Sequence, residues 1–149
     1  MTKSDLLEFI ASRKLGVVSS LSSFGIVQSA LVGIAVTQDL EIIFDTVKSS
    51  RKYSNLINHP ECSFVVGWTG EQTLQFEGTA TELHGAELER FQKTYFGAWP
   101  DGPSRIAWPG IVYFVVRLPG SDRVISMQIR RTFRNFVSEF GTRSPIKFQ

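Results

Sequence analysis

Apolar residues recur along the chain in short runs, several of which alternate with polar residues, and turn-forming residues separate the runs. Runs of this kind predict β-strands. We expect strands over residues 15–21, 26–37, 40–44, 62–68, 73–83 and 111–118. The clearest alternation lies in 73–83, where Leu74, Phe76 and Gly78 alternate with polar residues. That segment is predicted to be an antiparallel strand with one face in solvent.

Three further segments have the spacing of helices. We expect a short capped helix that begins at Ser4, and two more helices over residues 48–58 and 86–96. His59 and Pro60 follow the second helix and end it. The helices do not alternate with the strands, which argues against a doubly wound fold. Many short strands with hairpin-like spacing favour a small closed barrel, because closure removes exposed sheet edges.

Composition narrows the class of protein further. The chain has 149 residues, 42% hydrophobic and 20% charged, which is typical of one globular domain, and its net charge of +2 is too small to indicate nucleic-acid binding. The single cysteine, Cys62, excludes an internal disulfide, fits a reducing compartment and is expected to be buried and inert. With only two histidines beside it, no metal site is expected. No membrane-spanning run or signal-peptide core is present, so we expect a cytoplasmic protein.

The candidate chemistry lies where the predicted strand ending at Phe44 runs into the predicted helix. Hydroxyl and cationic side chains gather there as Ser49, Ser50, Arg51 and Lys52. The first turn of a helix offers unpaired N–H groups and the positive end of the helix dipole, and both favour an anion. Arg can hold two phosphate oxygens and Lys adds a point charge, so a phosphate monoester is the predicted ligand. An N-cap serine beside a solvated cation pair would explain the same residues without a ligand.

Four motifs follow one another in a specific order. They are residues 28–33, residues 44–46 with 50–52, Asn58 with Pro60, and residues 72–78. In order and spacing they resemble the split-barrel flavin-binding proteins related to pyridoxamine 5′-phosphate oxidase, and the resemblance covers residues 5–118. It implies a mainly β fold, a six-stranded antiparallel split β-barrel in Greek-key order with a few short flanking helices.

The resemblance also implies a cofactor and the residues that hold it. The cofactor is FMN, bound at the interface of a homodimer, with deazaflavin F420, FAD and haem as less favoured alternatives. The implied cofactor-binding residues are Gln28, Ser29, Ala30, Leu31, Asp45, Thr46, Ser50, Arg51, Lys52 and Gln72. Residues 50–52 match those that hold the phosphate, and residues 28–31 and 45–46 match those that approach the isoalloxazine ring. Gln72 matches a glutamine that contacts the flavin or its ribityl chain, in some members from the neighbouring subunit.

Three positions depart from the family members that oxidise pyridoxamine phosphate. Those members carry a cation at the position of Gly33, an arginine at that of Gln28, and a basic Trp-containing segment where this chain has residues 124–129. We therefore expect an FMN-dependent oxidoreductase that acts on a different small molecule. Its catalytic residues stay unknown, because a flavin can carry the reaction itself. The alternatives are a non-catalytic protein that stores or senses FMN, and a dimeric barrel scaffold with a basic tail.

Residues 130–149 form that tail, outside a predicted barrel domain of residues 1–129. Arginine and lysine outnumber a single acid, Glu139, and phenylalanines recur at helical spacing. We expect a helix that packs on the barrel or on a partner subunit. Contact with nucleic acid or an anionic membrane is the less favoured alternative.

The chain has three tryptophans, Trp68, Trp99 and Trp108. We expect core or interface packing for them, because large aromatic side chains usually serve there. Lining a flavin or substrate pocket is the alternative.

Overall fold

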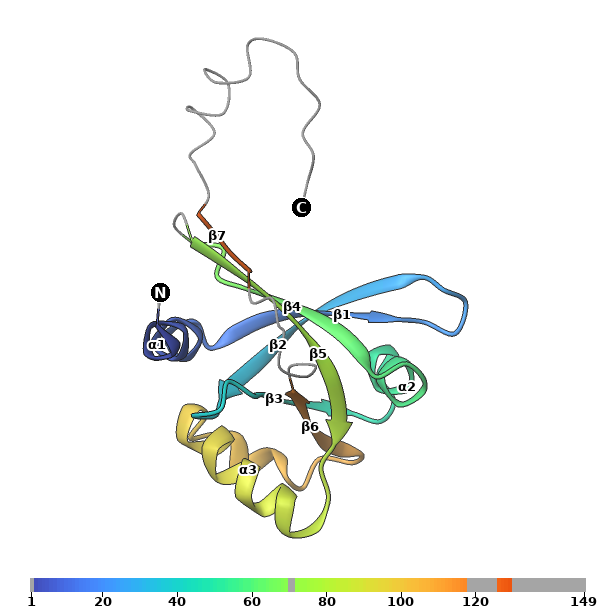
Figure 1. Ribbon diagram of the computed structural model, residues 1–149. Coiled ribbons are helices and arrows are strands. Elements are labelled where there is room, and N and C mark those ends of the chain that lie inside the picture. Colours follow the sequence, from blue (N-terminus) through green and yellow to red (C-terminus); the bar gives the residue numbers. More distant parts are fainter. Residues whose placement is uncertain (1, 70–71, 118–125, 130–149) are drawn as a thin grey trace.

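The computed structural model describes residues 2–69, 72–117 and 126–129 (Figure 1). Its strands are β1 (Leu15–Leu21), β2 (Val27–Val36), β3 (Ile42–Val47), β4 (Glu61–Val66), β5 (Gln72–Glu82), β6 (Ile111–Arg117) and β7 (Ser126–Ile129). Its helices are α1 (Lys3–Arg13), α2 (Arg51–Asn58), α3 (Gly85–Ala98) and the short 3-10 helix η1 (Gly102–Arg105). Each of the predicted strands and helices outside the tail is present, and β1 has the predicted bounds.

The sheet closes on itself. Its strands pair in the order β4-β1-β2-β3-β6-β5, and a further pairing of β5 with β4 completes a barrel in which the described strands are all antiparallel. β1, β2 and β3 follow one another as neighbours before β4 returns to lie beside β1, which is a Greek-key arrangement. The expected six-stranded antiparallel barrel is confirmed. The sequence pattern did not predict β7, which pairs with the start of β5.

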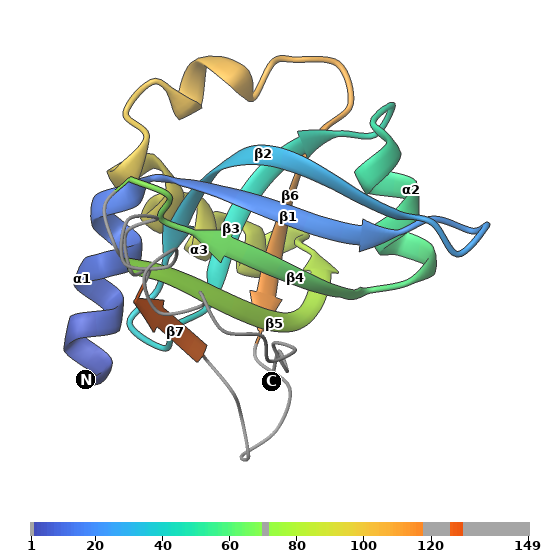
Figure 2. The same ribbon diagram turned by 90° about the horizontal axis from the view of Figure 1, so that it is seen from above.

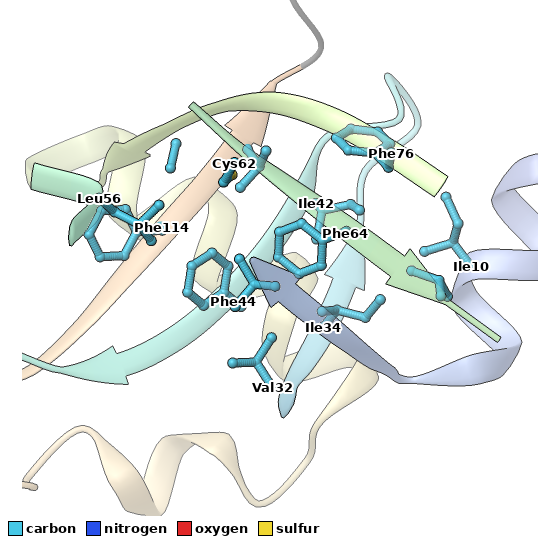
Figure 3. Packing of buried hydrophobic residues seen from close by; sticks show 14 of the residues in the cluster. Ile10, Val32, Ile34, Ile42, Phe44, Leu56, Cys62, Phe64, Phe76 and Phe114 are labelled. Atoms are coloured by element: carbon cyan, nitrogen blue, oxygen red, sulfur yellow. The ribbon is translucent and has the colours of Figure 1, made fainter. Parts of the chain in front are cut away.

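Aromatic and branched aliphatic side chains fill the barrel (Figure 3). The ring of Phe44 lies 5.7 Å from that of Phe64 and 5.5 Å from that of Phe114, measured between centroids. β6 is buried on both faces, because α3 covers the outside of the barrel there. Val112, Phe114 and Val116 belong to the interior cluster, and the residues between them pack with α3. This double burial accounts for the unbroken apolar sequence of β6.

β3 begins later and ends later than the predicted strand over residues 40–44. Leu40 has a φ of 61°, and its N–H donates to the carbonyl of Thr37, so it belongs to a turn. The Thr37 hydroxyl also accepts from the N–H of Glu41 at 3.2 Å. A leucine rarely adopts the left-handed conformation, so an apolar residue next to a strand is predicted to belong to that strand. At the other end the strand runs on to Val47 because its last residues pair with β6.

Capping residues set the starts of α1 and α2. Thr2, rather than the expected Ser4, caps α1: the Asp5 N–H donates to the Thr2 hydroxyl and the Asp5 carboxylate accepts from the Thr2 N–H. α2 begins at Arg51 rather than at residue 48, because Ser50 is its N-cap. The cation pair therefore lies in the first turn of α2.

The connection from β3 to β4 carries α2 across one end of the barrel (Figure 2). Leu56 is buried in the interior cluster, and the Tyr53 hydroxyl donates to the Glu82 carboxylate at 3.1 Å, at the end of β5. These two contacts fix α2 on the barrel. Its position places the strand-to-helix junction against β1 and β2.

Residues 130–149, for which a packed helix is predicted, lie outside the described residues. Within the described ranges, no helix has both the length and the apolar character needed to cross a bilayer.

Candidate functional site

The junction between β3 and α2 is held together by hydroxyl groups. The Ser50 hydroxyl accepts from the N–H of Tyr53 at 3.3 Å and lies 3.0 Å from the hydroxyl of Thr46, with which it shares a hydrogen bond. Ser50 is thus the N-cap of α2, as the explanation without a ligand requires. Capping alone does not exclude a ligand at the same place. The Ser50 hydroxyl still lies at the helix start, beside the free N–H groups of the first turn.

A buried asparagine ties α2 to the barrel wall behind this junction. The Asn55 side-chain amide donates to the Ser20 hydroxyl at 3.1 Å and to the side-chain oxygen of Gln28 at 3.0 Å. Since the oxygen of Gln28 is engaged, its N–H₂ group is the part of the side chain that can donate to a ligand. Gln28 therefore presents a neutral donor.

These residues enclose a pocket of about 210 Å³, called here the basic pocket. It is lined by Ser20, Gln28, Ser29, Ala30, Ser50, Arg51 and Lys52. Burial lowers the pKa of the Lys52 ammonium, and the nearby Asp45 carboxylate opposes that shift. Hydroxyls, an amide and two cations thus converge at the start of a helix, a donor set that suits an anion with several oxygens.

A second pocket of about 380 Å³, called here the aromatic pocket, shares Lys52 with the first. It is lined by Leu15, Leu31, Val32, Gly33, Asp45, Thr46, Val47, Lys52, Tyr95, Trp99, Arg105, Trp108 and Ile111. The shared lysine makes the two pockets adjoining parts of one site, which runs from α2 to the loop that follows α3.

Nine of the ten predicted cofactor-binding residues line one or both of these pockets, and Gln72 lines neither. Gln72 is the first residue of β5, whereas Glu82, which bonds to α2, is the last. At about 3.3 Å per residue, the length of the strand separates Gln72 from the basic pocket within one chain.

Asp45 anchors a polar network at the floor of the aromatic pocket. Its carboxylate lies 3.3 Å from the Nε of Arg105, and the Arg105 guanidinium also donates to the Asp101 carboxylate at 2.7 Å. The side chains of Asp45 and Arg105 are 16% and 17% exposed, so water screens this pair only weakly. Burial raises the pKa of the Tyr95 hydroxyl, and a hydrogen bond to Asp45 adds to the shift, so Tyr95 stays a neutral phenol.

Trp99 forms a fixed wall of the same pocket. Its indole N–H donates to the carbonyl of Ile34 at 3.0 Å. A Cβ placed on Gly33 would lie 3.0 Å from the Trp99 ring and 3.4 Å from the Tyr95 hydroxyl. The aromatic side chains therefore occupy the space in front of Gly33.

Sequence reasoning did not assign Arg105 or Tyr95 to the site, and it favoured packing for Trp99 and Trp108. Trp99 packs against β2 and also lines the pocket, and Trp108 lines its rim. The available signal was the loop over residues 97–110, where large aromatics and an arginine stand among Pro and Gly. Loops of this kind, held by a rigid scaffold, often carry binding residues.

A third pocket of about 380 Å³ lies over β1, β4, β5 and the start of β2, and none of the predicted cofactor-binding residues lines it. Its charged lining residues are Glu61 and Glu77, both acidic. Two carboxylates repel a phosphate, so the anion-binding chemistry belongs to the basic pocket.

The free thiol of Cys62 is predicted to be unreactive in the folded protein. Burial raises its pKa from 9.0 to about 12, so almost no thiolate forms at neutral pH. Labelling by iodoacetamide at pH 8 should proceed only after unfolding in denaturant. Because the folded state keeps the proton longer, the free energy of unfolding should fall as the pH rises above about 9. Rapid labelling of the native protein would show that Cys62 is accessible.

The fold and the site together define a class of protein: a small antiparallel β-barrel with a basic pocket at the start of α2, the helix that connects β3 to β4. Residues 2–132 match the sequence profile of the family described as pyridoxamine 5′-phosphate oxidase. Because the match spans most of the chain, the chain belongs to this family. The resemblance carried by the four motifs is confirmed. A sequence search of curated proteins finds no match.

Several solved structures share the fold. The conserved hypothetical protein Rv2991 from Mycobacterium tuberculosis is 20% identical, with 90% of this chain and 88% of that chain covered and a TM-score of 0.68. A heme binding protein from Mycobacterium smegmatis is 15% identical, with 87% and 58% covered and a TM-score of 0.68. An F420 reductase is 16% identical, with 76% and 92% covered and a TM-score of 0.60.

At these identities the similarity shows the fold alone. The chain spans 55% and 58% of the length of two of the matched structures. The names of the matched proteins include different cofactors, so the choice of cofactor has to be argued from the pocket residues of this chain.

Proposed function

We propose that the chain binds FMN, with the phosphate in the basic pocket, and that it acts as a flavin-dependent oxidoreductase on a small molecule. The convergence of Ser50, Arg51 and Lys52 on the first turn of α2 carries the proposal. Charge-assisted hydrogen bonds and the helix dipole both favour a terminal phosphate there. Gln28 adds an uncharged donor, oriented by Asn55.

The other predicted residues fit the rest of the cofactor. Asp45 and Thr46 on β3 and Leu31 on β2 line the aromatic pocket, which adjoins the basic one. Bound FMN supplies the hydride or electron transfer, and the chain positions it and excludes water. Asp45 and Tyr95 set the polarity of the floor, the first as a carboxylate paired with Arg105 and the second as a neutral phenol. No side chain is assigned an acid or base role.

The pocket residues favour FMN over the other cofactors. Haem needs an axial ligand, and no histidine, cysteine or methionine lines either pocket in the described parts of the chain. Tyr95 is a poor ligand because burial raises its pKa and keeps its proton in place. FAD and deazaflavin F420 carry their phosphates within the molecule, whereas a compact pocket of about 210 Å³ suits the terminal monoester of FMN.

Titration of the purified protein with FMN and with riboflavin, which lacks the phosphate, tests the proposal. We expect saturable one-to-one binding of FMN and binding of riboflavin weaker by about 100-fold, since charge-assisted hydrogen bonds contribute about 1.5–3 kcal/mol each. Equal affinities would mean that the basic pocket does not hold the phosphate. If the protein does not bind FMN but binds haem or F420, that molecule takes the place of FMN in the proposal. Turnover with NAD(P)H then separates an enzyme from a protein that stores or senses FMN.

We further propose that the chain forms a homodimer through the hairpin of β1 and β2, which projects from the barrel (Figure 1). Large apolar side chains are exposed on it, with Phe24 at 88%, Val27 at 68% and Ile26 at 59%. Several exposed large apolar side chains gathered in one hairpin favour an interface there. The family resemblance supports a dimer with the cofactor between subunits, and a partner subunit would bring a second Gln72. A cytoplasmic location stays a prediction.

Val27→Glu should convert this dimer into monomers, because it places a charge on the exposed side of β2. Size-exclusion chromatography with light scattering measures the change in mass. Thr81→Glu, which changes an exposed β-branched residue of β5 away from the hairpin, is the matched control and should leave the mass unchanged. A Val27→Glu protein that remains dimeric would place the interface elsewhere.

A further inference from the structure

We propose that the third pocket, over β1, β4 and β5, is the docking site of residues 130–149 of the same chain. This pocket has a volume of about 380 Å³ and is called here the acidic pocket, because Glu61 and Glu77 are its charged lining residues. The inference concerns neither the cofactor nor the two pockets assigned to it. It therefore does not rest on the proposed function.

The two glutamates form a pair of like charges on the outer face of the barrel. In the pairing of β4 with β5, Glu61 lies opposite Thr79 and Ser63 lies opposite Glu77. The glutamates are thus diagonal neighbours on one face, a position about 7–8 Å apart in antiparallel sheets. Both are exposed, and within the described residues neither forms an ion pair. A cation that reaches both carboxylates relieves their repulsion and is bound favourably.

The charge of residues 130–149 is complementary to this pocket. Five of the chain's 16 arginines and lysines lie there, with one of its 14 acids, so the segment carries a net charge of +4 and residues 1–129 carry −2. Lys52 lines both the basic and the aromatic pocket, and a cation there repels a basic segment. Of the three pockets described, the acidic pocket is the one whose charged lining residues all attract it.

The pocket also needs an apolar occupant. Leu21 and Val27, which line it, are 36% and 68% exposed. A simple inorganic cation would leave these side chains open to water, whereas a segment with both cations and large apolar groups would cover them. Phe133, Phe136 and Phe140 recur at spacings of three and four, which in a helix brings them to one face. The segment therefore carries both kinds of side chain that the pocket suits.

β7 starts this segment on the strand that carries one of the glutamates. Ile129, the last residue of β7, pairs with Gln72, and Glu77 lies five residues further along β5. That separation is about 17 Å at 3.3 Å per residue. β7 runs antiparallel to β5, so the chain has to reverse after Ile129, which takes about four residues. The rest of the segment spans about 24 Å even as a helix, so it reaches the pocket without a partner chain.

A nitroxide spin label on Ser144→Cys in the full chain tests where the segment lies. Labelling without denaturant spares the buried Cys62, and mass spectrometry checks that one label is attached. We expect the amide NMR signals of residues 19–21, 61–63 and 77–79 to broaden relative to the same sample with the nitroxide reduced. The signals of α3, which packs on β3 and β6, should keep their intensity. Broadening at other residues only, or at none, would overturn the proposal.

Glu61→Gln combined with Glu77→Gln tests the charge argument without a change in side-chain size. The broadening at residues 19–21 should be lost, and trypsin should cleave after Arg134 about threefold faster or more, because exposed ion pairs contribute modestly but measurably. Glu8→Gln combined with Glu89→Gln is the matched control: it removes the same two charges from exposed positions that line none of the three pockets. Its broadening and cleavage rate should match those of the unsubstituted glutamates. Equal effects of the two double variants would show that overall charge alone acts and would overturn the proposal.

A mixed sample distinguishes the chain's own segment from that of a second copy. Isotope-labelled chain without a nitroxide is mixed with spin-labelled chain at natural isotope abundance, and the two are left to exchange subunits. We expect little broadening at residues 61–63 and 77–79, because each pocket holds the segment of its own chain. Broadening as strong as in the singly prepared sample would assign the pocket to the segment of another copy and would overturn the proposal.

Discussion

Arg51→Ala combined with Lys52→Ala should weaken FMN binding by about 100-fold or more and leave the barrel folded. Each charge-assisted hydrogen bond to phosphate contributes about 1.5–3 kcal/mol, and a loss of 1.4 kcal/mol corresponds to about tenfold in affinity. Both residues lie in the first turn of α2, outside the hydrophobic core, so the fold does not depend on them. Fluorescence titration of FMN measures the affinity, and circular dichroism checks the fold.

Arg90→Ala combined with Lys93→Ala is the matched control. It removes the same two residue types and the same charge from an exposed part of α3. Its affinity for FMN should match that of the wild type at moderate salt, where long-range charge effects are screened. If both double variants lose affinity equally, the effect is one of overall charge. If Arg51→Ala with Lys52→Ala binds FMN as tightly as the wild type, the basic pocket does not hold the phosphate.

Phe44→Ala should lower the free energy of unfolding by about 3–5 kcal/mol, the usual cost of removing a buried phenylalanine ring. Phe44 is fully buried and lies between Phe64 and Phe114 in the barrel interior (Figure 3). Alanine would leave a cavity bordered by β-strands that pairing holds in place, so the walls cannot collapse onto it. Urea denaturation followed by tryptophan fluorescence measures the change.

Phe24→Ala makes the same chemical change at an exposed turn between β1 and β2. Its effect on unfolding should stay within about 0.5 kcal/mol at a protein concentration where both variants have the same oligomeric state. Comparable losses for Phe24→Ala and Phe44→Ala would contradict the assignment of Phe44 to the core.

The features that the sequence predicts well are those that depend on neighbouring residues. β1 was predicted to the residue because its apolar run is bounded by clear breaks on both sides. The junction from Phe44 to Lys52 was identified because one short segment carries the strand, the cap and the cations. Here the local pattern and the tertiary structure agree, as they do where a fold is well specified.

The features that were missed depend on contacts between distant parts of the chain. Arg105 reaches Asp45 across 60 positions, and Trp99 reaches Ile34 across 65. The spacing of hydrophobic residues along the sequence carries no information on contacts between such distant residues. The aromatic pocket therefore could not be predicted from that spacing. The prediction that Leu40 begins a strand was wrong for a different reason. Leu40 is apolar like the strand residues that follow it, but its backbone has the left-handed conformation of a turn.

The way in which α2 is attached to the barrel has a consequence for how this architecture can diversify. Arg51 and Lys52, the first two residues of α2, supply the charges of the basic pocket, whereas Tyr53, Asn55 and Leu56, which follow them, make the attachments to the barrel. The charges that face the pocket and the side chains that support the helix are thereby different residues of one short helix. Substitutions at Arg51 or Lys52 can alter what the site accepts while the core keeps its full stability, so a lineage can change its ligand in few mutational steps without passing through unfolded intermediates.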